Sequence, residues 1–258
     1  MRADVYLFEH GFAKSRQNAK VLIEKQSIKI DGKIVIKPAL DIDESIDHAI
    51  EIVNEQKFVS RGGEKLERAL NDFNINVDNC ACLDVGASTG GFTDCLLQRG
   101  ASVVYAVDSG HNQLDPKISS DSRVISIEKY NARYIEQNDF PIKFDIAVMD
   151  VSFISQTFMH KGISSVLKDD GQLIALIKPQ FECGKRALNS HGIVKKSVHH
   201  LQAINKIIDS AIICGFSCIN ITRSPFEDVN INREYLIHLQ KSPNPQNLIT
   251  DNKIKQFL

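Results

Sequence analysis

The segment Cys80-Ala81-Cys82-Leu83-Asp84-Val85-Gly86-Ala87-Ser88-Thr89-Gly90-Gly91-Phe92 indicates the fold class of this chain. An apolar run ends in Asp84, a loop rich in glycine follows, and a run with helical spacing begins at Phe92. This order is typical of a strand, a tight turn and a helix N-terminus, with which open α/β sheets hold nucleotide-like ligands. Glycine suits the loop because it reaches positive φ angles and lets a ligand contact the backbone.

The loop does not read GxGxxG but Asp-x-Gly-x-Ser-x-Gly-Gly, which resembles motif I of S-adenosylmethionine (SAM) methyltransferases. A second apolar run, 103–107, leads directly into Asp108, 22 residues after Gly86. An acid about 20 residues beyond such a loop binds ribose hydroxyls, and SAM carries a ribose. An ordinary βαβ unit with a packing turn is the alternative, but the two features in register favour a SAM or nucleotide site. The expected cofactor-binding residues are Asp84, Gly86, Ser88, Gly90, Gly91, Phe92, Asp108, Asn131 and Asp150.

Composition indicates an ordinary globular protein of one or two domains, with 258 residues, 43% hydrophobic and 24% charged. No apolar run approaches the roughly 20 residues of a transmembrane helix, and the start Met1-Arg2-Ala3-Asp4 lacks a signal-peptide core. We therefore expect a cytoplasmic protein. The six cysteines suit reduced, buried thiols better than a disulfide framework. No CxxC pair or His cluster completes four ligands, so we expect no metal.

The N-terminal residues form a basic module. Residues 1–37 hold eight basic and four acidic side chains, which gives +4, so the rest of the chain carries −5 of the total −1. The pattern predicts two short helices and then a hairpin turning at Asp31-Gly32. This arrangement resembles the S4 RNA-binding domain, with Ala13 to Gln17 and Ile28 to Lys33 as the matching segments. A solvated helical module with scattered lysines is the alternative. The RNA-binding residues that we expect are Lys14, Arg16, Lys20, Lys33 and Arg61.

Strands alternate with helices through most of residues 80–240, which predicts a doubly wound, mostly parallel sheet. The apolar run 144–149 ends at Asp150 and the run 171–177 ends at Lys178, so both residues stand at the carboxyl ends of strands. Residues 218–222 and 235–239 predict a closing antiparallel hairpin at the edge. We expect an α/β protein with an S4-like α+β domain at 1–60 and a Rossmann-like methyltransferase domain at 61–258.

The chain resembles the TlyA family, historically labelled hemolysin A, and more broadly the FtsJ-type ribose methyltransferases. The matching segments are Val59–Leu66, Leu83–Asp94, Met149–Ser155 and Lys178–Glu182. The resemblance implies SAM-dependent 2′-O-ribose methylation of ribosomal RNA, with cytidine as the expected nucleoside and with ribosomal RNA or a subunit as the partner. It also implies a catalytic tetrad of Lys65, Asp150, Lys178 and Glu234. The segment 224–234 departs from the family because it lacks the usual glycines.

The implied chemistry needs a base, because a ribose hydroxyl is a poor nucleophile at neutral pH. A free lysine has a pKa of about 10.4. Burial and a second cation, such as Lys65, would lower the pKa of Lys178, whereas Asp150 and Glu234 would raise it. The sequence leaves this balance open, and Lys178 as the base is a hypothesis.

Three other functions remain as alternatives. The first is methylation of a base. The sequence has no Asn-Pro-Pro-Tyr motif for transfer to an amino nitrogen. Cys183 could be a nucleophile for C5 methylation, but it is not part of a Pro-Cys dipeptide. A membrane-lytic activity lacks an inserting segment. A non-catalytic RNA-binding or assembly factor would not bind SAM. A monomer is the expected oligomeric state.

Overall fold

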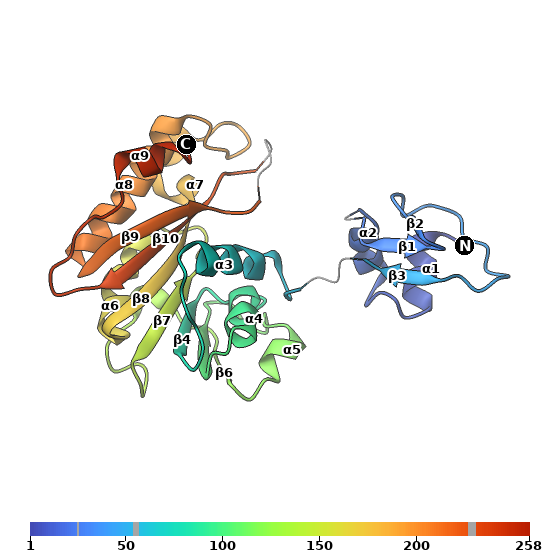
Figure 1. The fold of residues 1–258 in the computed structure, drawn as a ribbon, viewed down its shortest axis with the longest axis horizontal. Coiled ribbons are helices and arrows are strands. Elements are labelled where there is room, and N and C mark those ends of the chain that lie inside the picture. Colours follow the sequence, from blue (N-terminus) through green and yellow to red (C-terminus); the bar gives the residue numbers. More distant parts are fainter. Residues whose placement is uncertain (25, 54–56, 227–230) are drawn as a thin grey trace. The chain divides into compact units, whose positions relative to one another are not determined.

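The computed structural model describes residues 1–24, 26–53, 57–226 and 231–258 (Figure 1). The chain divides into two compact units, Met1–Lys57 and Phe58–Leu258. The assignment of residues 1–60 to RNA binding and 61–258 to methyl transfer remains a proposal about what these units do.

The first unit packs two helices against a small antiparallel sheet, which in the described ranges has the order β2-β1-β3. Its core contains Leu7, Ile23 and Ile28, each fully buried. The predicted turn is present, since Asp31 and Gly32 both have positive φ, as a two-residue hairpin turn requires. The elements are α1 (Ala3–Glu9), α2 (Arg16–Glu24), β1 (Ile28–Ile30), β2 (Lys33–Ile34) and β3 (Ile50–Ile52).

The second unit is built on a sheet of seven strands within the described residues, in the order β6-β5-β4-β7-β8-β10-β9. The helices, including short 3-10 turns labelled η, are α3 (Arg61–Asp72), α4 (Gly91–Gln98), α5 (Pro116–Ser119), η1 (Ala132–Tyr134), η2 (Gln156–Phe158), α6 (His160–Val166), α7 (Pro179–Glu182), η3 (Lys185–Ala187), α8 (Ser197–Ile213) and α9 (Asp251–Lys255). The strands are β4 (Ala81–Val85), β5 (Val103–Val107), β6 (Val124–Ile127), β7 (Phe144–Met149), β8 (Leu167–Ile177), β9 (Phe216–Arg223) and β10 (Tyr235–Lys241).

The sheet is parallel from β6 to β8, and the chain reverses its direction of travel across the sheet at the adjacent strands β4 and β7. Ligands of open α/β sheets bind outside the carboxyl ends of the strands at such a switch point. β10 runs antiparallel to both β8 and β9 and lies between them. The predicted hairpin therefore exists, but its second strand is internal and its first strand forms the edge.

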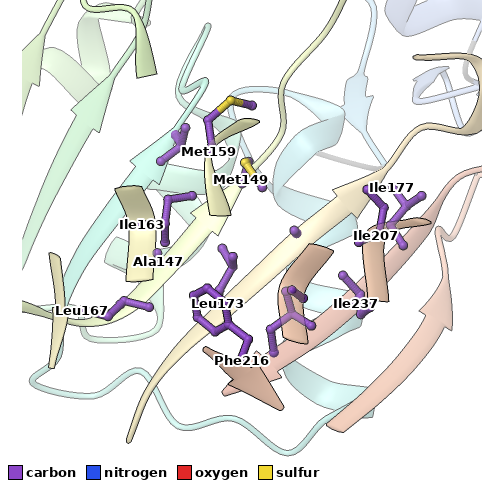
Figure 2. Packing of buried hydrophobic residues seen from close by; sticks show 14 of the residues in the cluster. Ala147, Met149, Met159, Ile163, Leu167, Leu173, Ile177, Ile207, Phe216 and Ile237 are labelled. Atoms are coloured by element: carbon purple, nitrogen blue, oxygen red, sulfur yellow. The ribbon is translucent and has the colours of Figure 1, made fainter. Parts of the chain in front are cut away.

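Two hydrophobic clusters cover the two faces of this sheet. One joins Ile163 of α6 and Ile207 of α8 to strand residues such as Leu173 and Ile237 (Figure 2). The other joins α3 and α4 to the opposite face, with Leu66, Leu70, Leu96, Val104 and Leu236 buried. Burial from both sides explains why these strands are apolar almost throughout.

Segment 242–258 is folded, although its Pro and Asn content is typical of a disordered tail. Thr250 caps α9, and its hydroxyl accepts a hydrogen bond from the Lys253 backbone N–H. Ile249 and Ile254 are buried in the cluster that covers α8. The Arg223 Nε also donates to the Phe257 carbonyl at 3.0 Å. A few buried apolar side chains therefore order a segment whose average composition is polar.

Candidate active site

The glycine loop leaves β4 at Gly86 and enters α4 after Gly90. Both glycines have positive φ, +83° and +89°, which L side chains rarely adopt. A Cβ on Gly86 would also lie 2.6 Å from the carbonyl oxygen of Asp150, so the loop passes against the end of β7. Two separate constraints thus require glycine at position 86.

Asp108, at the end of β5, holds this loop in place. Its Oδ2 accepts a hydrogen bond from the Ser88 backbone N–H at 2.8 Å, and its Oδ1 accepts one from the Gly110 N–H at 2.7 Å. An ionised carboxylate has about four acceptor positions. Asp108 can therefore still accept hydrogen bonds from two hydroxyl groups.

Two adjoining cavities lie at the switch point. The larger, of about 370 Å³, is bounded by Asp108 and Asn131 and by the apolar side chains of Val107, Ile154 and Met159. The smaller, of about 190 Å³, includes Lys178, Gly91 and Phe92 in its wall. Residues common to both walls are Gly86, Ser88, Asp150 and Ser152.

Two expected cofactor-binding residues, Asp84 and Gly90, do not belong to either wall. Asp84 is fully buried, and Thr93 Oγ1 donates a 2.6 Å hydrogen bond to its Oδ2. Within the described residues, its Oδ1 has no hydrogen-bond partner. Burial, with smaller contributions from the charges of Asp150 and Asp108, raises the pKa of Asp84 to about 7. Asp84 and Gly90 therefore stabilise the conformation of the loop and do not line the cavities.

Lys178 and Asp150 meet where the two cavities adjoin. The Lys178 Nζ lies 2.5 Å from Asp150 Oδ1 in an ion pair and donates a hydrogen bond to Ser152 Oγ at 2.8 Å. The side chains of Lys178 and Asp150 are 12% and 21% exposed, so the pair is only partly open to solvent. Ser152 is a site residue that the sequence analysis did not single out, although it follows the strand-end Asp150 closely.

Lys65 and Glu234 form the second ion pair, with 2.6 Å between Nζ and Oε2. Tyr235 of β10 pairs with Ile177 of β8, so one further step in this antiparallel register sets Glu234 opposite Lys178. The structure thus brings the four residues of the implied tetrad together as two ion pairs. Asp150, Lys178 and Glu234 adjoin the ends of the neighbouring strands β7, β8 and β10, and Lys65 lies on α3. Residues 227–230 of the glycine-free segment lie outside the described residues.

Phe153 lines the larger cavity, and it is a second residue that was not among the site residues expected from the sequence. Its side chain is 90% exposed, its φ is +63°, and its ring centroid lies 5.1 Å from that of Phe181. A large aromatic residue rarely adopts such a backbone conformation, which is a common sign of a functional position. The sequence signal is its place three residues after Asp150.

The expected RNA-binding residues of the first unit lie on its surface, where Lys14 and Lys33 are exposed and Lys20 is half-buried. Arg16 has a second task, because its Nε donates to Asp4 Oδ2 at 3.0 Å. Asp4 is fully buried, and hydrogen bonds from Arg2 and Arg16 hold its pKa at about 2. Arg61 lies in the second unit, at the start of α3, with its guanidinium 5.6 Å from the Phe226 ring centroid.

In the part of the chain that the structure describes, no helix is long and apolar enough to cross a membrane. No group of three or more His, Cys, Asp or Glu side chains among those residues is arranged to hold a metal ion. The six cysteines are free thiols.

The walls of the two cavities fit the parts of SAM. Asp108 has acceptor positions left for the ribose hydroxyls, and the side chains of Val107, Ile154 and Met159 provide apolar walls for an adenine ring. Asp150 offers a negative charge toward the cationic end of the molecule. With the doubly wound sheet and the glycine loop, these features define a SAM-dependent methyltransferase.

Comparison with known proteins identifies the family. Residues 58–241 match the FtsJ-like methyltransferase family and residues 1–45 match the S4 domain. The chain is 42% identical to "Hemolysin A" of Brachyspira hyodysenteriae over 92% of this chain and 99% of that one. It is 35% identical to "16S/23S rRNA (cytidine-2'-O)-methyltransferase TlyA" of Mycobacterium tuberculosis, over 93% and 89%. A solved structure from Streptococcus thermophilus, "Putative hemolysin", matches with a TM-score of 0.78 and 39% identity, covering 100% of this chain and 94% of that one.

The chain therefore belongs to the FtsJ-like methyltransferase family, in the group that includes hemolysin A and TlyA, and it also carries an S4 domain at residues 1–45. The fold class and the SAM cofactor expected from the sequence are confirmed.

Proposed function

We propose that this protein transfers a methyl group from SAM to the 2′-oxygen of a ribose in ribosomal RNA, with cytidine as the nucleoside. The observation that carries the proposal is the pair of Lys-carboxylate contacts, Lys178–Asp150 and Lys65–Glu234, beside the SAM-binding loop. The relative named as a 16S/23S rRNA (cytidine-2'-O)-methyltransferase supports both the substrate and the position of methylation.

SAM supplies an electrophilic methyl group, and the protein must provide a deprotonated hydroxyl aligned with it. We assign the acceptance of the hydroxyl proton to Lys178 Nζ. Lys178 must be in its neutral amine form to do so, and Asp150 Oδ1, 2.5 Å away, holds its Nζ in place. Ser152 Oγ, 2.8 Å from the same Nζ, fixes the direction of the side chain.

Lys65 and Glu234 have a different role in this scheme. Each ionised group satisfies the other, so their pair forms a partly buried and fixed polar surface opposite Lys178. Such a surface can hold the ribose in one orientation, and fixed alignment of two reacting groups accounts for a large share of many rate enhancements.

The S4 domain docks the RNA in this proposal. Its exposed lysines give salt-dependent contacts to phosphates, which position the RNA without reading its sequence. Ribosomal RNA, free or within a subunit, is the proposed partner. We propose that the protein acts as a monomer in the cytoplasm, where its substrate is made.

The experiment is methyl transfer from isotope-labelled SAM to ribosomal RNA, followed by digestion to nucleosides and mass analysis. The expected product is 2′-O-methylcytidine, and Lys178→Met should abolish its formation while SAM still binds in calorimetric titration. Label on a base would contradict the tetrad scheme. A protein that binds RNA but does not bind SAM would instead be a non-catalytic assembly factor.

A further inference from the structure

A buried carboxylate outside the tetrad ties together the two segments that carry Lys178 and Asp150. Glu182 ends α7, four residues after Lys178, and its side chain is 2% exposed. Its Oε1 accepts a hydrogen bond from the Gln156 backbone N–H at 2.9 Å, and its Oε2 accepts one from Ser155 Oγ at 2.5 Å. Ser155 and Gln156 end the segment that begins at Asp150.

Lys206 of α8 completes this arrangement. Its Nζ donates to Glu182 Oε2 at 2.8 Å, to Ser155 Oγ at 3.1 Å and to the Glu182 carbonyl at 3.3 Å. An ammonium group has three protons, so all of its donors are used. The network fixes three elements, η2, α7 and α8, to one another through a single ion pair whose carboxylate is buried.

The segments after β7 and β8 are thus joined twice. At the cavity they meet through Lys178, Asp150 and Ser152, and farther from it they meet through Glu182 and Lys206. Glu182 and Lys206 line neither of the two cavities at the switch point, and their hydrogen bonds go to Ser155, Gln156 and each other. The location of this second junction means that it can set the distance between the two segments without contacting the substrate.

We propose that Glu182 is a positioning residue, which holds the segments after β7 and β8 at the separation that lets Lys178 reach Asp150 and Ser152. The inference rests on the proposed function, because it concerns the rate of the same methyl transfer. Glu182 lies outside the tetrad and keeps its Lys178–Asp150 pair assembled.

The test compares Glu182→Gln with the wild-type protein in single-turnover methyl transfer at saturating SAM and RNA, normalised to the number of SAM-binding sites. Gln replaces one acceptor oxygen by an NH₂ donor that faces Ser155 or Lys206. We expect a fall of about 10- to 100-fold in the rate constant, since small misplacements of reacting groups cost that much. SAM affinity should change less than about threefold, because Asp108 and the glycine loop are untouched.

A matched control lies at the other end of the same two strands. Lys168 Nζ and Asp145 Oδ1 join β8 to β7 at 2.7 Å, far along the strands from the cavities. Lys168→Met should leave the rate per SAM-binding site unchanged. An equal loss in both variants would show that any weakened interaction between these strands has this effect and would overturn the assignment.

Two further measurements guard against a variant that simply folds poorly. The charge-neutral double variant Glu182→Gln with Lys206→Met leaves no unpaired buried charge, so it should fold and yet remain slow. Amide exchange of residues 151–154, measured without RNA, should become faster in Glu182→Gln but not in Lys168→Met. A double variant with the wild-type rate would overturn the inference. A wild-type protein that methylates no ribose would instead contradict the proposed function.

Discussion

Lys65 and Glu234 lie 169 positions apart in the chain, yet their Nζ and Oε2 atoms are only 2.6 Å apart and both side chains are 16% exposed. Since the cavity walls in the described structure include neither residue, their loss should affect catalysis more than cofactor binding. We expect Glu234→Gln to lower the single-turnover rate about 100-fold and to leave the SAM dissociation constant within about twofold. Arg68→Met, on the same helix α3, is the control and should keep the wild-type single-turnover rate and SAM dissociation constant. A lost SAM affinity would place Glu234 in cofactor binding instead.

Gly86 offers a test of the cofactor loop. Gly86→Ala forces a Cβ to 2.6 Å from the Asp150 carbonyl oxygen at a φ of +83°, so the loop must move. We expect at least a tenfold weaker SAM binding in calorimetry. Gly192→Ala is the matched control, because Gly192 has a φ of +73° with nothing within 4 Å of its Cβ position. It carries only the backbone cost of about 1 kcal/mol, and equal SAM affinities for the two variants would disprove the account.

Lysines on the surface of the first unit, exposed Lys14 and half-buried Lys20, should govern RNA affinity and its salt dependence. Lys14→Ala and Lys20→Ala should each weaken binding and reduce the slope of log affinity against log salt by about 0.9 for each phosphate that is no longer neutralised. Filter binding at several salt concentrations measures both quantities. Lys253→Ala, in α9 of the second unit, serves as the control of equal charge. Unchanged affinity in both lysine variants would remove these side chains from the RNA interface.

Arg16→Ala should differ from the lysine variants because it also affects stability. The substitution removes one of two guanidinium partners of the buried Asp4, and the absence of a hydrogen bond to a charged group costs about 1.5 to 3 kcal/mol. Asp4 has a pKa of about 2 in the folded protein, so its contribution is present above the usual carboxyl pKa and is lost as pH falls through 2. Chemical denaturation at pH 7 should show the loss for Arg16→Ala and not for Lys14→Ala.

Buried histidines should make the second unit sensitive to acid. Burial lowers the pKa of His160 and of His238 to about 4, so the unfolded chain takes up these protons near pH 6.5 and the folded chain does not. Stability is therefore lost as pH falls from 6.5 toward 4. Asp84 acts in the opposite sense, because its raised pKa of about 7 contributes stability that is present at low pH and lost as pH rises through 7.

The two effects can be separated by urea denaturation between pH 7.5 and pH 4.5. Asp84→Asn removes the opposing contribution, so stability should fall more steeply with acid than in the wild-type protein. An equal fall in the two proteins would mean that Asp84 is ionised throughout this range and contributes nothing to the pH dependence.

Local sequence was enough to predict the glycine loop, because the turn, the close approach to the backbone and the strand-end acid each limit the residue types allowed. Asp108, Asp150 and Lys178 could be placed at the same edge for the same reason. The position of β10 between β8 and β9 could not be predicted, since pairing between distant strands leaves no periodicity in either one. That Lys65 and Glu234 belong to one site came only from the resemblance, and their direct ion pair was not predicted. Ser152, Phe153 and Glu182 were missed because their importance depends on what they face.

The internal position of β10 has a consequence for the order of assembly during translation. β9 is synthesised first but can reach its edge position only after β10 has been added to β8, and α9, which follows, packs over the finished sheet. The reactive centre therefore stays incomplete in the nascent polypeptide until Glu234 and β10 have been synthesised. A chain made only as far as β9 would in this way already hold the glycine loop and Lys178 but lack the carboxylate that pairs with Lys65.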